Sequence, residues 1–267
     1  MNLLFIGDVV GKGGRRACRA LIPELRKEHN VSFVIVNVEN AANGAGINAK
    51  CLKELENVVD VFTLGDHVWD QKGFDKEINN YKNVIRPANY SDRQPGNGYC
   101  IVRNPASGDI AVINLVGKVF MRDSAYCPFE KIDEILKKIP KTVKTIIVDM
   151  HCEATSEKAG MAHYLDGRVT AVLGTHTHVQ TNDAKVLPGG TAFITDVGMV
   201  GGEYSVLGRT VESVVQKFGT SMPCRLPVEE SNIRLDGAIV SYNLSDGKAT
   251  AIKPISKMHN KEEDIVE

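Results

Sequence analysis

The chain has 267 residues and a formal net charge of −1, from 32 Lys and Arg against 33 Asp and Glu, so no bulk attraction to nucleic acid or an anionic membrane is expected. Hydrophobic residues make up 43% of the chain and charged residues 24%, which excludes a disordered, collagen-like or coiled-coil protein. This length allows one large α/β domain or two small ones with a sizeable buried core.

The N-terminus predicts a first strand rather than a signal peptide. Its apolar residues run straight into Gly7-Asp8, with no basic region, no long apolar stretch and no small-residue cleavage site. The longest apolar runs, such as Thr145–Val148, have the length of a strand and are too short to span a membrane. The six cysteines lie far apart with no C-x-x-C pair, which is typical of reduced thiols. These features favour a cytoplasmic protein with no membrane partner.

Short β-branched runs alternate along the chain with polar turns and with segments of helical periodicity, which predicts an α/β fold. The expected buried strands are Leu3–Ile6, Phe33–Val38, Val61–Leu64, Thr145–Asp149, Val169–Leu173 and Thr191–Thr195. Apolar spacing predicts helices over Arg15–Glu28, where Pro23 is a candidate kink, and over Phe129–Lys138. Turn signals predict two antiparallel hairpins, Gly98–Arg103 with Ile110–Leu115 and Ala238–Asn243 with Ala249–Lys253. A mixed sheet or two sheets should result.

Three segments fall outside this alternation. The stretch from Gly11 to Gly14 fits neither the dinucleotide-binding nor the Walker spacing, so we expect a flexible turn that leads into the first helix. Residues 201–236 carry several Gly and Pro residues around one short helical segment, and are a candidate cap or lid within a single domain that spans residues 1–267. The polar tail from Lys257 to Glu267 is expected to fray.

Polar side chains that can bind metal follow several of the expected strands. They are Asp8, Glu39, Asn40, Asp66, His67, His151, His176 and His178. Because the carboxyl ends of the strands form the ligand crevice of an open α/β sheet, these groups should meet in one place. So many carboxylates and imidazoles are too costly to bury unpaired, which indicates one divalent cation or two.

The types of ligand discriminate among metals. Imidazole and carboxylate without thiolate suit Mn, Fe, Zn, Co or Ni, rather than a structural cysteine-bound zinc or an all-oxygen calcium site. The donors outnumber what one tetrahedral ion needs. Two ions about 3.5–4 Å apart, bridged by a carboxylate and a water or hydroxide, would use them all and would polarise a phosphoryl centre for in-line attack.

At these residues the chain resembles the calcineurin-like metallophosphoesterases, whose strands end in short Asp, Gly-Asn-His and Gly-His-x-His motifs. It is most similar to the YmdB family of bacterial phosphodiesterases. The matching stretches cover nearly the whole chain and are Phe5–Gly11, Asn37–Ala42, Gly65–Asp70, Tyr164–Arg168, Gly174–Gln180 and Ile194–Met199. The resemblance implies a metallophosphoesterase-like β-sandwich of mixed sheets, flanked by helices on both sides.

Carried over residue by residue, the resemblance implies two metal sites that share Glu39 as a bridge. The first would be held by Asp8, Glu39, Asn40 and His178. The second would be held by Glu39, Asp66, His151 and His176. The ions would be divalent or of mixed valence, with iron or manganese expected before zinc, cobalt, nickel or magnesium.

Two positions depart from the superfamily pattern. The first motif reads Asp8-Val9-Val10 where Asp-x-His is usual, so the Asn40 amide oxygen is expected to replace the missing imidazole and the first site should be weaker. Asp66 stands where an Asn is usual, and its extra negative charge should hold the second ion more tightly while reducing its Lewis acidity.

His67 corresponds to the superfamily histidine that lies outside the metal shell, where it would protonate the leaving alkoxide. The implied reaction is hydrolysis of 2′,3′- or 3′,5′-cyclic nucleotides by attack of a metal-bridging hydroxide on phosphorus. Two alternatives stay open: a regulatory protein that binds metal and nucleotide or RNA with little turnover, and a metal-dependent hydrolase of an amide or ester. The resemblance also suggests a homo-oligomer, whereas no basic patch supports RNA as a partner.

The remaining candidates have a structural interpretation. Three histidines match no ligand motif and are expected at the surface or at helix ends: His29, His163 and His259. Cys152 is interpreted as structural. Asp196 is explained equally well by a turn and by a hydrogen bond to a metal-binding histidine. Trp69 and Tyr164 are candidates to stack on a base, although core packing is favoured for the tryptophan.

Overall fold

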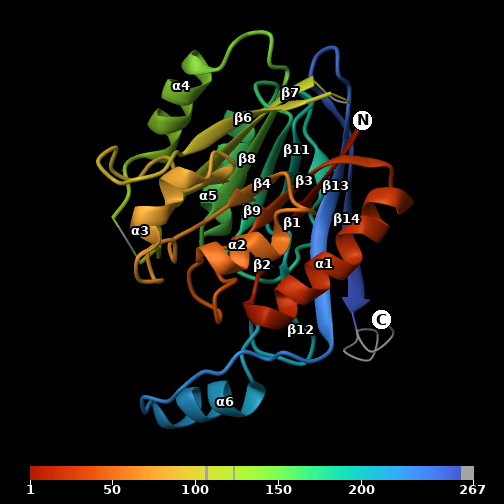
Figure 1. Cartoon of the computed structure of the whole chain (residues 1–267). Helices are drawn as coiled ribbons and strands as arrows, with labels where there is room; N and C mark the ends of the chain where they lie inside the picture. Colours follow the sequence, from red (N-terminus) through yellow and green to blue (C-terminus); the bar gives the residue numbers. More distant parts are fainter. Residues whose placement is uncertain (106–107, 123, 260–267) are drawn as a thin grey trace.

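The computed structural model describes residues 1–105, 108–122 and 124–259. Two β-sheets pack face to face, and helices cover the outer face of each sheet (Figure 1). The expected β-sandwich of mixed sheets with helices on both sides is therefore confirmed.

The first sheet has eight strands in the order β2-β12-β13-β1-β3-β4-β5, with β14 paired to β13. Its strands are β1 Asn2–Ile6, β2 Asp8–Val9, β3 Val31–Asn37, β4 Val61–Thr63, β5 Val84–Ile85, β12 Met199–Gly202, β13 Ile233–Tyr242 and β14 Ala249–His259. Strands β1, β3, β4 and β5 are parallel, whereas β13 is antiparallel to each of its neighbours. The carboxyl ends of β3 and β4 consequently meet at one edge of this sheet.

The second sheet has six strands in the order β10-β11-β9-β8-β7-β6. These are β6 Tyr99–Asn104, β7 Gly108–Val116, β8 Thr145–His151, β9 Ala171–Thr175, β10 Lys185–Val186 and β11 Ala192–Ile194. Its four central strands are parallel, and the edge strands β6 and β10 are antiparallel to them. The carboxyl ends of β8 and β9 therefore also lie at a common edge.

Three apolar clusters hold these layers together. Between the sheets, Phe5 and Phe33 of the first sheet pack against Val112, Ile147 and Leu173 of the second, and all five are fully buried. Helices α1 Gly11–Glu28 and α2 Ala49–Leu55 cover the first sheet, and α4 Pro128–Lys138 and α5 Thr155–Tyr164 cover the second. The shorter α3 Phe74–Glu77, the 3-10 helix Ile78–Asn80 and α6 Val211–Thr220 complete the described helices.

The first helix begins earlier than the sequence predicts. The stretch from Gly11 to Gly14 is helical rather than a flexible turn, so that expectation is wrong. A Cβ atom on Gly14 would lie 2.5 Å from the Val200 carbonyl oxygen, so the glycine is needed for close packing of α1 on β12. Pro23 does not shorten the helix, which continues to Glu28.

Both predicted hairpins are present, and the second is longer than predicted. Strand β13 begins at Ile233 and β14 runs to His259, so Lys257 is not part of a frayed tail. Residues 260–267 of the expected tail lie outside the described residues. His259 is buried in β14, which corrects the expectation of a surface position, whereas His29 and His163 lie at the ends of α1 and α5 as expected.

The segment 201–236 contains the end of β12, all of α6 and the start of β13. Helix α6 stands apart from both sheets, joined to them by extended connections (Figure 1). Across the described ranges, no helix is both long enough and apolar enough to cross a membrane.

Candidate metal centre

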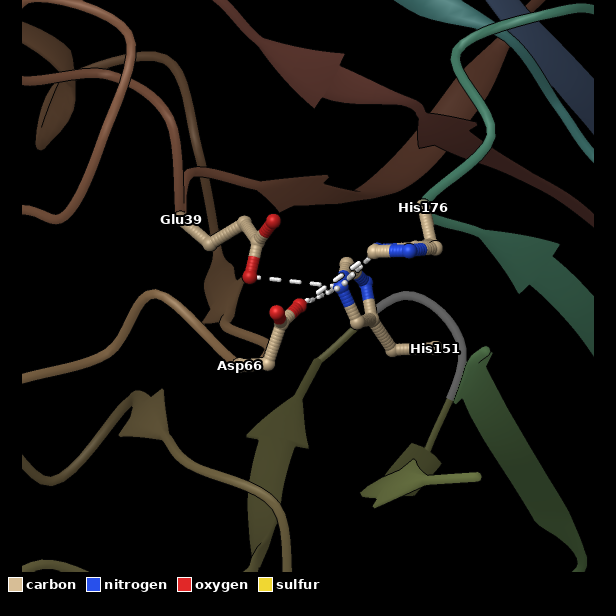
Figure 2. A group of neighbouring side chains, drawn as sticks. All are labelled: Glu39, Asp66, His151 and His176. Atoms are coloured by element: carbon tan, nitrogen blue, oxygen red, sulfur yellow. Dashed lines mark hydrogen bonds and ion pairs between the residues drawn. The ribbon is translucent and has the colours of Figure 1, made fainter. Parts of the chain in front are cut away.

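The candidate ligands meet where strand ends of both sheets come together. Glu39 and Asp66 follow β3 and β4 of the first sheet, whereas His151 ends β8 and His176 follows β9 of the second. These four side chains point toward one another (Figure 2), and one potential ligand atom of each lies within 4.8 Å of all the others. The expected convergence of strand-end residues is thus present, but it takes two packed sheets rather than a single open one.

His151 lies at the centre of this four-residue cluster and is fully buried. Its Nε2 atom is 3.2 Å from Glu39 Oε2, 3.1 Å from Asp66 Oδ1 and 3.1 Å from His176 Nδ1 (Figure 2). Burial opposes protonation of His151, but the surrounding carboxylates outweigh it and raise the pKa of His151 well above its usual value. Burial likewise opposes ionisation of Glu39 and Asp66, yet the histidine contacts lower the pKa of both carboxyl groups. The cluster therefore favours a positive charge at its centre, whether a proton or a metal cation.

Asp8, Asn40 and His178 adjoin the same cluster, and Asn40 contacts the other carboxylate oxygen of Glu39. Asn40 Nδ2 donates to Glu39 Oε1 over 2.8 Å and lies 3.4 Å from His178 Nε2, which is 3.9 Å from Asp8 Oδ1. The Asp8 Oδ1 atom is buried and has no hydrogen-bond partner among the described residues, and burial raises the pKa of this carboxyl group. A buried carboxylate oxygen without a hydrogen bond is costly, and coordination of a cation would satisfy it.

His151, His176 and His178 each direct one ring nitrogen toward the carboxylates of the cluster. The other ring nitrogen of each contacts a hydrogen-bond acceptor outside the cluster. His178 Nδ1 lies 3.2 Å from the Leu207 carbonyl oxygen, and His176 Nε2 lies 3.3 Å from a Glu153 carboxylate oxygen. Because these oxygens only accept, the outward nitrogens carry a hydrogen, so that in the neutral ring the inward nitrogen has the lone pair. This tautomer is the one that binds a metal ion through the inward nitrogen.

The third ring, that of His151, is oriented by a buried network that the sequence analysis missed. Thr175 Oγ1 donates to Asp149 Oδ1 over 2.6 Å, so it accepts from His151 Nδ1, which lies 2.9 Å away. Asn37 Nδ2 donates to the other Asp149 oxygen over 3.0 Å, and its Oδ1 accepts the backbone N–H of Glu39. Burial raises the pKa of Asp149 to about 6. Asn37 thus links β3 of the first sheet to β8 of the second beneath the site.

A buried ion pair holds the loop that carries His176 and His178. Both histidines have positive φ angles, +98° and +62°, which side-chain-bearing residues rarely adopt. Asp196 accepts from the backbone N–H of Thr177 at 3.1 Å and from its hydroxyl at 2.7 Å, and its Oδ2 lies 2.7 Å from Lys158 Nζ. Of the two interpretations of Asp196, the structure favours the turn. Sequence reasoning missed Lys158, because a single lysine in a helix carries no signal of its burial.

His67 lies outside the four-residue cluster and borders the same hollow. Its Nδ1 atom is 2.7 Å from Asp70 Oδ2, and the Arg122 guanidinium donates to both oxygens of that carboxylate over 3.0 Å. Burial opposes protonation of His67, but Glu39 and Asp70 outweigh it and raise the pKa of the imidazole above its usual value. Sequence reasoning missed the Asp70 contact, which favours a protonated His67, and the Arg122 contacts that hold Asp70 in place.

The hollow above the cluster has a volume of about 370 Å³. The polar lining comes from the loops at the strand ends and consists of Glu39, Asn40, His67, Glu153, His176, Thr177 and His178. The apolar lining comes mainly from the segment that contains α6, whose Arg209 also lines the hollow, and Val10 adds a further apolar side chain. A small phosphate ester that enters the hollow can therefore reach the carboxylates and imidazoles.

Other candidates from the sequence lie away from the hollow. Trp69 packs against the core beside the first sheet and donates to Gln94, as core packing predicts. The exposed Tyr164 donates to Asp133 at the end of α5. Cys152 is buried, and burial raises the pKa of its thiol to about 12, which supports a structural interpretation.

The chain is similar to known proteins over almost all of its length. Residues 4–255 match the YmdB-like protein family. The chain is 42% identical over 257 residues to the 2′,3′-cyclic-nucleotide 2′-phosphodiesterase of Bacillus subtilis, with 96% of each chain covered. A hypothetical protein from Thermus thermophilus has a similar crystal structure, with a TM-score of 0.90 and 36% identity over 97% of this chain and 100% of that one. A novel phosphatase from Mycoplasma pneumoniae also gives a TM-score of 0.90, at 30% identity over 100% and 96% of the chains.

Proposed function

The chain belongs to the YmdB-like family, and from this membership and the geometry of its site we propose that it is a metal-dependent phosphodiesterase acting on cyclic nucleotides. The observation that carries the proposal is the set of three imidazoles that turn one ring nitrogen each toward the buried carboxylates of Asp8 and Asp66. The Bacillus subtilis relative is named for 2′,3′-cyclic nucleotides, so these are the first substrates proposed and 3′,5′-cyclic nucleotides the second.

We assign two cations, which would share Glu39 as a ligand. Asp66, His151 and His176 would hold one cation together with Glu39. Asp8, Asn40 and His178 would hold the other, and of these Asn40 contacts Glu39 Oε1. A half-turn of the Asn40 amide would present its oxygen rather than its nitrogen to a cation. Mixed imidazole and carboxylate ligands suit iron or manganese, which we propose before zinc, cobalt, nickel or magnesium. When bound, such ions supply Lewis-acid polarisation of the phosphoryl group and a water nucleophile of lowered pKa.

His67 is assigned as the proton donor of the reaction. Hydrolysis of a 2′,3′-cyclic nucleotide forms a bond between the oxygen of water and phosphorus, breaks the bond from phosphorus to the 2′ oxygen, and leaves that oxygen needing a proton. His67 borders the hollow, and its contact with Asp70 and the nearby Glu39 favour the imidazolium form that can donate one. The Arg122 contacts hold Asp70 in place for this hydrogen bond.

Replacing His67 by alanine tests both the reaction and this assignment. Turnover of 2′,3′-cyclic AMP by the purified protein is measured with Mn²⁺ supplied or removed by chelator, and with 3′,5′-cyclic AMP in parallel. His67→Ala is expected to lose about 10²- to 10⁴-fold in kcat while its metal content, measured by elemental analysis, stays at the wild-type level. The control is His163→Ala at the exposed end of α5, which should keep full turnover.

Two results would contradict the proposal at different levels. Wild-type turnover by metal-loaded His67→Ala would remove the proton-donor role and leave the phosphodiesterase intact. Failure of the metal-loaded wild-type protein to hydrolyse either cyclic nucleotide would instead favour a regulatory protein that binds metal and nucleotide.

We also propose a reducing, cytoplasmic location for this single-domain protein, supported by six cysteines that are all free thiols. A homo-oligomer is proposed from the family resemblance alone, and light scattering on the purified protein tests it.

A further inference from the structure

The hollow above the metal cluster has an apolar wall that the proposed reaction leaves without a role. We define the apolar wall as the five apolar lining side chains from residues 206–226, around and within α6, which are Val206, Leu207, Val214, Phe218 and Leu226. Arg209 of the same segment and Val10 after β2 also line the hollow. Because α6 stands apart from the two sheets (Figure 1), this wall is an addition to the sandwich rather than a part of its core.

Phe218 supplies the aromatic surface of this wall. Val214 and Phe218 are four residues apart on α6, so they occupy the same face of the helix, and both line the hollow. Val214 is buried, whereas Phe218 is 77% exposed. Neighbouring Val215 is 60% exposed and does not line the hollow. Leu207, which is 47% exposed, lines the same hollow, and apolar side chains exposed together beside a polar site are typical of a ligand-binding groove.

Two sets of contacts fix the apolar wall relative to the metal cluster. The Leu207 carbonyl oxygen accepts from Nδ1 of His178, so the wall touches a candidate metal ligand directly. The Arg209 guanidinium donates to the carbonyl oxygens of Gly44, in the loop after β3, and of Leu226, in the wall itself. Gly44 has a φ of +83°, which side-chain-bearing residues rarely adopt, so glycine is favoured at this contact.

We propose that the apolar wall is the nucleobase subsite of the enzyme, with Phe218 stacking on the base while the polar side of the hollow holds the phosphodiester. This inference rests on the proposed function. A nucleotide has the same division as the hollow, an anionic phosphate at one end and a flat apolar base at the other. The volume of about 370 Å³ lies within the range of about 300–1,000 Å³ found for small-molecule pockets. Stacking accepts any base, so the subsite should tolerate both purines and pyrimidines.

Phe218→Ala tests the subsite through two substrates that share one reacting group. 2′,3′-Cyclic AMP and glycerol 1,2-cyclic phosphate both contain a five-membered cyclic phosphodiester, but only the first has a base. Phe218→Ala is expected to raise KM for 2′,3′-cyclic AMP by about 5- to 150-fold with little change in kcat, and to leave glycerol 1,2-cyclic phosphate hydrolysis unchanged. Phe218→Trp should keep the wild-type KM because it retains an aromatic face, and Val215→Ala on the same helix should behave as wild type.

The inference is overturned if Phe218→Ala leaves KM for 2′,3′-cyclic AMP unchanged, or if it slows both substrates equally. An equal loss together with a change in oligomeric mass would assign this helix face to a contact with a second copy of the chain. Calorimetric titration with adenosine 3′-phosphate tests the nucleobase subsite without turnover. Phe218→Ala should bind this nucleotide about 5- to 150-fold more weakly than the wild-type protein does. A wild-type protein that hydrolyses neither substrate refutes the proposed function, whereas equal binding of this nucleotide by both proteins refutes the subsite.

Discussion

Replacing Lys158 by methionine is expected to destabilise the fold far more than the loss of one ion pair usually does. Lys158 is fully buried on α5, and its Nζ atom lies 2.7 Å from the equally buried Asp196. Methionine keeps an unbranched side chain that can fill the space but removes the cation. Asp196 would then remain as a buried carboxylate without its counter-charge.

Breaking a buried ion pair by removing one partner costs about 3–5 kcal/mol, because the other charge stays behind uncompensated. Asp196 would keep the Thr177 backbone and hydroxyl donors and the Gly198 N–H, which favours the lower end of that range. At about 2–4 °C per kcal/mol for chains of roughly this size, the corresponding fall in Tm is about 6–20 °C.

The assay is urea unfolding followed by far-UV circular dichroism, with both proteins in excess chelator because a bound metal ion would add its own stabilisation. The matched control is Lys257→Met, which removes a lysine whose Nζ atom lies 2.9 Å from Glu24 on the surface. An exposed pair of this kind contributes less than about 1 kcal/mol. If Lys158→Met destabilises the protein no more than Lys257→Met does, the argument for the buried pair is wrong.

Two further predictions concern the metal centre. Thr175→Val removes the hydroxyl that joins Asp149 to His151 Nδ1. We expect it to weaken metal binding by about 10- to 100-fold, measured by competition titration with a chromophoric chelator. An unchanged Kd for the metal would show that this hydroxyl does not orient the ring. Removal of divalent metal by chelator should lower Tm, and Mn²⁺ should restore it, because the buried carboxylates of Asp8 and Glu39 lose their counter-charge. Identical melting curves with and without chelator would argue against a metal in this cluster.

Several residues of the candidate metal centre could be predicted because they have a local signal. A β-branched run identifies the strand, and the first polar residue after it identifies the side chain at the carboxyl end, as with Glu39 after β3 and His176 after β9. The two hairpins were equally accessible, since Asn, Gly and Asp mark their turns in the sequence.

What escaped prediction depends on contacts between residues far apart in the chain. In the sequence, Lys158 looks like an ordinary helical lysine. Its burial follows only from the packing of α5 on the second sheet, which brings it against Asp196. The helical start at Gly11 is a similar case, because glycine disfavours a helix interior and only the approach of β12 to Gly14 explains it. The apolar residues of α6 likewise indicate a buried face, yet Phe218 borders a hollow instead.

The candidate site is divided between two sheets, so the distances between its side chains could not be predicted from the positions of the strand ends in the sequence. Glu39 and Asp66 belong to the first sheet and His151 and His176 to the second, so their separation depends on how the two sheets pack. That packing is set by the apolar cluster between the sheets and by the Asn37 contact with Asp149 across them. A substitution in this interface can therefore shift the two halves of the cluster relative to each other, even though it touches no candidate ligand.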